Sequence, residues 1–227
     1  MAIVYLICLA NSYKMGGRCL AGLRADGQGW VRPVAPDALH GQLYWRHFKL
    51  SDGTEPGPLD VVGVDLAEAC PSPGQPENWT IGNQPWILRR RPAGRDLYGI
   101  LRSALVPGPA LLGSFGRSIA ERASASACSS LALVAPAMLR WSVGERVRNR
   151  RQPRVLFKLK ERLYNLPVTD PLWTAKITRS LMGKGPGWQP SGAVGIPRGQ
   201  VLITVSLGEP YEGQRYKLAA GIVVLPS

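Results

Sequence analysis

The chain has 227 residues, 45% of them hydrophobic, with 26 Gly, 20 Pro and a formal net charge of +13. That length fits one large domain or two small ones, and the apolar content suffices for a packed core, which argues against global disorder. The high Gly and Pro content is typical of short strands joined by tight turns and argues against a helix bundle.

Strand patterns dominate the first third of the chain. Runs rich in β-branched and aromatic residues predict a three-strand meander at residues 3–9, 18–23 and 30–34. The second turn of this meander, Asp26-Gly27-Gln28-Gly29, carries a hairpin signal. Further along, alternating apolar residues predict a strand over residues 59–66, and an irregular Pro-rich arm follows at residues 71–76.

One helix is predicted, in the middle of the chain. Apolar residues recur at helical spacing from Leu111 to Ile119, which predicts a short amphipathic helix over residues 110–122. Strand patterns then resume at residues 131–134, 138–143, 154–160, 163–168, 201–207 and 216–225. In the third of these, Val155, Phe157 and Leu159 alternate with a largely basic face. This order predicts two small β-barrels or sandwiches joined near residues 110–130.

The positive charge is concentrated in one part of the chain. Residues 86–160 carry 15 basic and 3 acidic side chains, whereas the segments before and after them have net charges of −2 and +3. A local excess of this size favours polyanionic partners, because each phosphate contact releases condensed counterions. The alternative is a solvated basic face that only aids solubility.

Cysteine usage and hydropathy indicate the compartment. The four cysteines contain no CxxC pair and have no His at ligand spacing, so we expect reduced, mostly buried thiols and no zinc site. The apolar run at residues 2–10 lacks a basic region before it, so we interpret it as a buried strand rather than a signal peptide. No stretch approaches the roughly 18 apolar residues of a membrane span, so we expect a cytoplasmic protein with no membrane partner.

One segment combines cations with two adjacent glycines. In residues 11–22, Gly16 and Gly17 stand beside Lys14 and Arg18, a composition that suits a phosphate-cradling turn and equally a glycine-rich β-turn. This segment matches neither GxxxxGK[ST] nor GxGxxG.

Tryptophan residues offer stacking platforms for bases. Trp30 and Arg32 lie two residues apart on one side of a strand, where they could hold a base and its phosphate or belong to the core. Trp79 and Trp86 are aromatic residues of the same ambiguous kind. The loop at residues 183–188, with Lys184 and Trp188, suits a binding loop and equally a disordered tip.

Residues suited to catalysis are few. His40 and His47 are the only histidines, no nucleophile-elbow signature surrounds a serine, and the acidic residues form no carboxylate cluster for a metal. We therefore predict no catalytic residue, no metal ligand and no cofactor.

Several segments resemble a known family. Residues 11–14 (Asn-Ser-Tyr-Lys) with 16–22, then 30–34 and 75–79, are similar to the N-terminal half of bacterial dual OB-containing domain proteins, and residues 164–171, 206–211 and 216–218 are similar to the second half. The resemblance covers almost the whole chain. It implies two oligonucleotide/oligosaccharide-binding (OB) barrels in tandem, a nucleic-acid-recognition or sensing role and an association with prokaryotic defence.

With this resemblance, we expect a mainly β fold of two tandem OB-like small β-barrels with one short helix between or within them. The expected organisation is an N-terminal OB-like barrel with long loops at residues 1–110, a short helix and linker at residues 111–130, and a C-terminal OB-like barrel at residues 131–227.

We expect this protein to bind nucleic acid, single-stranded RNA or DNA, through a basic surface at the junction of the two barrels. It would act as a sensor or subunit of an antiviral defence or nucleoprotein complex. The expected binding residues are Lys14, Arg18, Trp30, Arg32, Arg89, Arg90, Arg91, Arg148, Arg150, Arg151, Arg154, Lys158, Lys160, Lys184 and Trp188. The alternatives are a protein–protein adaptor subunit of a larger complex, and a nucleotide- or nucleic-acid-processing enzyme that uses Lys14, Arg18 and a histidine.

Overall fold

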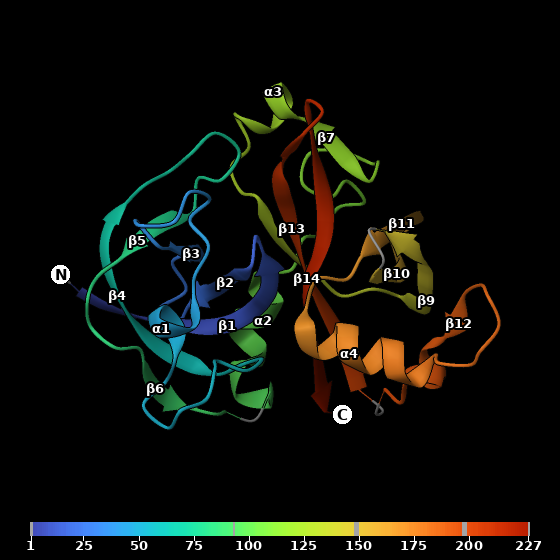
Figure 1. The fold of residues 1–227 in the computed structure, drawn as a ribbon, viewed down its shortest axis with the longest axis horizontal. Coiled ribbons are helices and arrows are strands. Elements are labelled where there is room, and N and C mark those ends of the chain that lie inside the picture. The colour runs from blue at the N-terminus through green and yellow to red at the C-terminus, as the bar shows by residue number, and fades with distance from the viewer. Residues whose placement is uncertain (1, 93, 148–149, 197–198, 227) are drawn as a thin grey trace.

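The computed structural model describes residues 2–92, 94–147, 150–196 and 199–226 and consists mainly of strands (Figure 1). The first half of the chain forms β1 (Ala2–Lys14), β2 (Gly17–Arg24), β3 (Trp30–Val34), β4 (Val61–Ala69), β5 (Asn78–Ile81) and β6 (Ile87–Arg90). The sheet order is β1-β2-β3-β5-β4, and β4 also pairs with β1, so these five strands close into a barrel. β6 extends the sheet beside the first residues of β4.

The predicted meander of β1, β2 and β3 is confirmed, although β1 is longer than the sequence pattern indicates. Residues 11–14 continue the strand because they pair with residues 17–20 across a two-residue turn, Met15-Gly16. Both turn residues have positive φ, 43° and 79°, as the hairpin turn that matches strand twist requires. This hairpin continues beyond Ile7, the last residue of β1 that pairs with β4, and it carries Tyr13 and Lys14.

The second half of the chain is a half-barrel of two four-stranded sheets. Their orders are β11-β10-β9-β12 and β7-β14-β13-β8. The strands are β7 (Ser118–Ala120), β8 (Leu131–Val134), β9 (Met138–Val147), β10 (Arg150–Leu159), β11 (Arg162–Pro167), β12 (Gln189–Pro190), β13 (Gly199–Tyr211) and β14 (Gln214–Pro226). The predicted alternation in β10 is confirmed, since Val155, Phe157 and Leu159 are buried in the core that the two sheets share.

The helices are short. They are α1 (Trp45–Phe48), α2 (Tyr98–Ser103), α3 (Glu121–Ser124), α4 (Pro171–Ser180) and the 3-10 turns η1 (Gly94–Leu97) and η2 (Ser191–Val194). No helix among the described residues is long and apolar enough to cross a membrane.

The prediction of a helix over residues 110–122 is wrong for most of its length. The chain makes a turn at Leu111–Ser114 and then the strand β7, and only its last residues enter α3. Leu112 and Gly113 take positive φ, which breaks a helix. Leu111 is buried from the turn and Ile119 from β7, whereas Phe115 is exposed.

The longest helix, α4, forms where the sequence pattern indicated only an Asp-Pro turn. Asp170 is its N-cap, with the carboxylate accepting a hydrogen bond from the Trp173 backbone N–H at 3.2 Å, and Pro171 is the first helical residue. Trp173 and Ile177 bury one side of this helix against the core of the second half.

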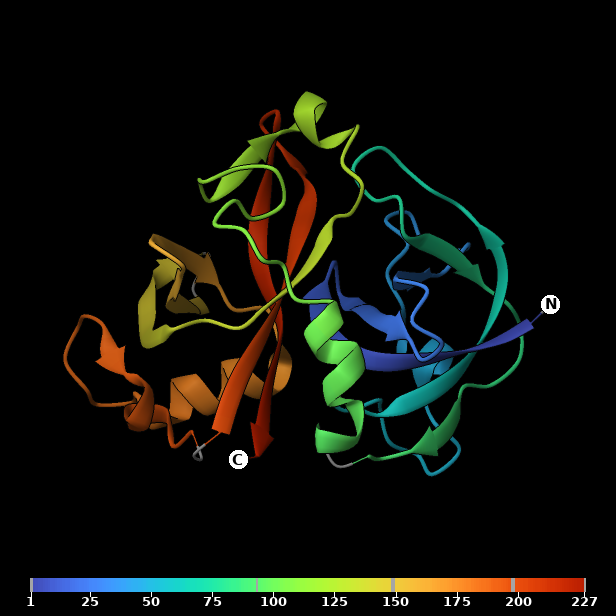
Figure 2. The same ribbon diagram turned by 180° about the vertical axis from the view of Figure 1, so that it is seen from behind.

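The two halves share a hydrophobic core at their junction. Ile7 and Leu9 of β1 pack there with Leu101 of α2 and with Leu202 and Val223 of the β13–β14 hairpin. In both views the long β13–β14 hairpin lies alongside β1, and Figure 2 shows α2 between the hairpin and the first barrel. The expected domain boundaries stay a prediction, because this shared core joins the two halves into one packed unit.

Candidate functional site

The basic residues of the middle third do not form one surface. Arg89 and Arg90 lie exposed on β6, at the edge of the first barrel, whereas the basic residues of β10 lie on the far side of the second half (Figure 1). Arg91 pairs with Asp52 and Asp60, at 3.2 and 3.5 Å. The predicted basic surface at the junction is therefore split, because β6 and β10 belong to different sheets.

Four further predicted residues also lie apart from the junction. Arg151 and Lys184 line one shallow cleft beside Gly144, Lys160 is exposed in the β10–β11 turn, and Trp188 is half-buried. Arg148 lies outside the described residues, and the side chain of Arg150 is likewise not described.

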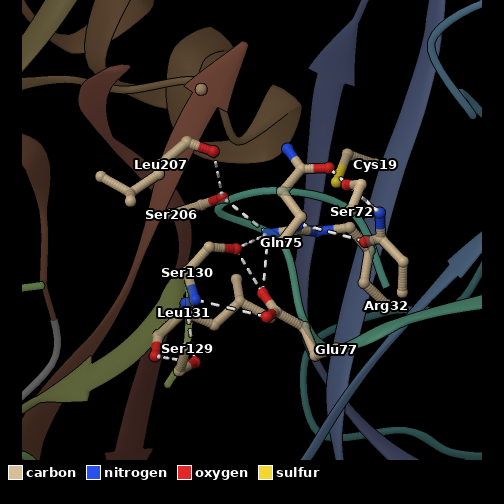
Figure 3. Close-up of polar contacts among 12 residues, drawn as sticks. Cys19, Arg32, Ser72, Gln75, Glu77, Ser129, Ser130, Leu131, Ser206 and Leu207 are labelled. Atoms are coloured by element: carbon tan, nitrogen blue, oxygen red, sulfur yellow. Dashed lines mark hydrogen bonds and ion pairs between the residues drawn. The ribbon is translucent and has the colours of Figure 1, made fainter. Parts of the chain in front are cut away.

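Arg32 is buried at the junction and not exposed to solvent. Its guanidinium lies 3.2 Å from the Glu77 carboxylate and donates to the hydroxyls of Ser130 and Ser206 at 2.7 and 3.2 Å (Figure 3). Glu77 also accepts hydrogen bonds from the backbone and the hydroxyl of Ser130. The expectation that Arg32 meets phosphate at a surface is corrected, since its face of β3 turns toward the second half.

The tryptophans predicted as stacking platforms are largely enclosed. Trp86 is buried in the first barrel and Trp79 packs against the same core. Trp30 packs against Ala21 and Leu131 where the halves meet. These side chains form the core because strands of a small barrel turn one face inward.

A cleft of about 310 Å³, here called the junction cleft, opens between the two halves. The first barrel contributes the β1–β2 hairpin with Tyr13 and Lys14, and Gln75 from the loop between β4 and β5. The second half contributes the β13–β14 hairpin with Tyr211 and Tyr216. Tyr13 and Tyr211 are 54% and 61% exposed, so aromatic rings stand at the rim of the cleft.

Charged groups meet across this cleft. The Lys14 ammonium lies 2.8 Å from the Glu209 carboxylate, and Gln75 donates to the same carboxylate at 3.4 Å. Lys14 holds the pKa of Glu209 below its usual range, against the opposing effect of burial. The Arg18 guanidinium lies 4.8 Å from the centre of the Tyr13 ring and 3.5 Å from Glu55. Of the predicted residues, Lys14 and Arg32 line the cleft, and Arg18 lies at its rim beside Tyr13.

The residues of the cleft that the sequence did not predict include Tyr13, Tyr211, Tyr216, Glu209 and Gln75. A usable signal for the tyrosines exists in the sequence, because Tyr211 directly precedes the turn Glu212-Gly213 and Tyr13 lies two residues before the turn Met15-Gly16. Glu212 and Gly213 have positive φ, 51° and 71°, as in the β1–β2 turn. All five of these residues lie within segments that carry the family resemblance.

A second cleft of about 230 Å³ lies on another side of the junction and is lined by Cys8, Asn11, Glu55 and Asp170. Burial raises the pKa of the Cys8 thiol, which makes it a poor nucleophile. Burial also raises the pKa of Asp170 to about 6. Among the described residues no group of three or more His, Cys, Asp or Glu could hold a metal ion.

The position of the junction cleft defines the class of protein. OB barrels bind ligands on the face of strands 2 and 3, between the loop joining strands 1 and 2 and the loop joining strands 4 and 5. The junction cleft is bounded by these same loops and by Cys19 and Arg32 of β2 and β3, with the second half as its other wall. The fold and the site are therefore those of a tandem OB-type protein whose ligand face is shared by both halves.

Comparisons with known proteins identify the family. The chain matches the family described as Dual OB-containing domain over residues 4–222, and it belongs to that family. No curated protein matches the sequence. A solved structure titled "Structure of murine DNA binding protein bound with ds DNA" aligns over 100% of both chains with 6% identity and a TM-score of 0.33, a similarity too low to carry an argument.

Proposed function

We propose that this protein binds single-stranded nucleic acid, with bases held in the junction cleft. The observation that carries the proposal is the composition of that cleft, where exposed Tyr13 and Tyr211 and half-buried Tyr216 surround Lys14 at the ligand face of an OB barrel. Stacking on aromatic side chains with cations nearby is how OB barrels hold single strands.

The charge of the protein favours a nucleic acid over the other usual OB ligand. OB barrels bind oligonucleotides and oligosaccharides, and aromatic rings suit both. A net charge of +13 favours the polyanion.

Titration of fluorescent oligo(dT) and oligo(U) into the protein tests the proposal, with anisotropy as the readout. We expect saturable binding that weakens at least tenfold between about 50 and 200 mM salt. Absence of binding to either oligonucleotide, or an affinity indifferent to salt, would overturn it.

The role as a sensor or subunit of a defence or nucleoprotein complex in the cytoplasm is also a proposal, supported by the family resemblance. Purification of the tagged protein from its native host, with and without nuclease, tests it. Recovery of nucleic acid that nuclease removes supports the proposal. A stoichiometric protein partner that survives nuclease favours the adaptor alternative.

A further inference from the structure

We infer that a second surface, the outer face of β9, β10 and β11, binds the phosphodiester backbone of a strand that leaves the junction cleft. This inference rests on the proposed function and assigns the path of the nucleic acid beyond the cleft. Three arginines carry it, Arg117, Arg140 and Arg154.

The register of the sheet places basic residues on one face. Arg154 of β10 pairs with Ser142 of β9, and its neighbour on the same face, Leu156, pairs with Arg140. The alternate residues of β10 point into the core, so Arg140 and Arg154 share the outer face. Arg140 is exposed and Arg154 is half-buried.

Arg154 is held in a fixed position without being neutralised. Its Nε and one terminal nitrogen donate to the side chain and the backbone carbonyl of Asn165, at 2.7 and 2.9 Å. Burial lowers the pKa of Arg154, and the positive charge of Arg117 lowers it further. Two arginines thus share one region of surface, which an anion would stabilise.

Arg117 connects this face to the junction cleft. Its guanidinium lies 5.9 Å from the centre of the Tyr216 ring, and Tyr216 lines the cleft. The loop that carries Arg117 is fixed from below, because the buried Lys217 ammonium donates to the carbonyls of Ser114 and Gly116 at 2.8 and 2.7 Å. The path from cleft to sheet face therefore runs over Tyr216 and Arg117.

The counter-charges on this face are few. Lys158 pairs with Glu161 at 2.9 Å, and no other ion pair between described residues involves the outer face of the three strands. Among the side chains that the structure describes, which do not include that of Glu145 on β9, no carboxylate pairs with Arg117, Arg140 or Arg154. Arg162 of β11 lies 4.9 Å from the ring centre of Phe115, which is 54% exposed, and a cation beside an exposed aromatic ring fits a single-stranded nucleic acid better than an acidic protein.

The test compares a short and a long oligo(dT), of about 4 and about 16 nucleotides, because one OB barrel covers a site of this range. The variant Arg117→Gln/Arg140→Gln/Arg154→Gln removes three charges from the path. The matched control, Arg89→Gln/Arg90→Gln/Arg102→Gln, removes three exposed charges from β6 and α2.

We expect the path variant to bind the long oligonucleotide at least about tenfold more weakly. The slope of the logarithm of the binding constant against the logarithm of the salt concentration should be smaller by about 2, since each phosphate contact to a single strand contributes about 0.7 to that slope. Binding of the short oligonucleotide should change less than about threefold, and the control should keep the wild-type preference for length. Equal loss in both variants, or no loss in the path variant, would overturn the inference while leaving the cleft proposal intact. If the wild-type protein binds neither oligonucleotide, the proposed function itself fails.

Discussion

Lys14 of the first barrel and Glu209 of the second half form an ion pair of 2.8 Å across the junction cleft. Both side chains are largely shielded from solvent, at 11% and 28% exposure, so the pair is screened less than a surface pair. The Glu209 carboxylate pairs with the Lys14 ammonium, which a phosphate bound at this face of the OB barrel would otherwise contact. Glu209 therefore competes with the proposed ligand for Lys14.

Glu209→Gln should strengthen binding of single-stranded oligonucleotides about three- to tenfold and increase the salt slope by about 0.7, because it releases one cation for phosphate contact. Anisotropy titrations measure both. Glu212→Gln, at the exposed tip of the same hairpin, is the matched control and should have a smaller effect. Weaker binding in Glu209→Gln would show that the carboxylate orders the cleft instead of blocking it.

The buried pair of Arg32 and Glu77 should be sensitive to loss of one partner. Glu77→Gln leaves the Arg32 charge uncompensated at 1% exposure, so we expect the free energy of unfolding to fall by about 3–5 kcal/mol. Urea unfolding measures this change. Glu68→Gln, on the exposed part of β4, is the control, and its free energy of unfolding should stay within about 0.5 kcal/mol of the wild-type value. A loss below about 1 kcal/mol for Glu77→Gln would contradict the importance of this pair.

Gly221 should be intolerant of a side chain, because the backbones of β14 and β1 approach closely there. A Cβ at this position would overlap the Leu9 carbonyl oxygen and lie 2.9 Å from the Ala10 Cα. We expect Gly221→Ala to destabilise the protein by about 1–3 kcal/mol. Gly99→Ala, where a Cβ meets nothing within 4 Å in α2, should be neutral or stabilising. Equal thermal midpoints for the two variants would refute this account of the junction.

The stability of the protein should depend on pH through Asp170. Burial raises the pKa of this carboxyl from 3.8 to about 6, so the folded state binds more protons than the unfolded state between these values. Its contribution to the free energy of unfolding is therefore fully present below about pH 4 and falls by up to about 3 kcal/mol as the pH rises past 6.

Asp170→Asn removes this titration, although it also weakens the bond that the carboxylate accepts from the Ile222 N–H at 3.1 Å. That loss is independent of pH, so the slope is the readout. In urea unfolding from about pH 4 to 7, the free energy of unfolding of the variant should rise relative to that of the wild type as the pH rises. Parallel curves would count against a raised pKa.

Much of the fold could be predicted from the sequence, because the continuous apolar run of β8 and the alternation of apolar residues in β10 are local properties. β5 and β6 were missed, since each has only four residues, and β5 also pairs in parallel with β3, which is distant in the sequence. For α4 the signal was present in Asp170-Pro171, but an Asp-Pro pair is typical both of a helix N-terminus and of a β-turn. The helix predicted over residues 110–122 does not form, because tertiary packing buries Leu111 from a turn and Ile119 from β7.

The site was less predictable than the fold. Its central contacts join residues far apart in the sequence, as Gln75 and Glu209 do, and the register that brings them together depends on how the two halves pack. Clustering of charge along the sequence did not predict clustering in space, since β6 and β10 lie on opposite sides of the molecule (Figure 1).

The most direct test of the central claim is a titration of one single-stranded oligonucleotide into three proteins, the wild type, Tyr13→Ala/Tyr211→Ala and Tyr13→Phe/Tyr211→Phe. The account predicts that the alanine variant binds at least about tenfold more weakly, because each stacked base contributes about 1–3 kcal/mol, and that the phenylalanine variant binds within about threefold of the wild type. Equal affinities for all three proteins would show that the junction cleft does not hold the bases.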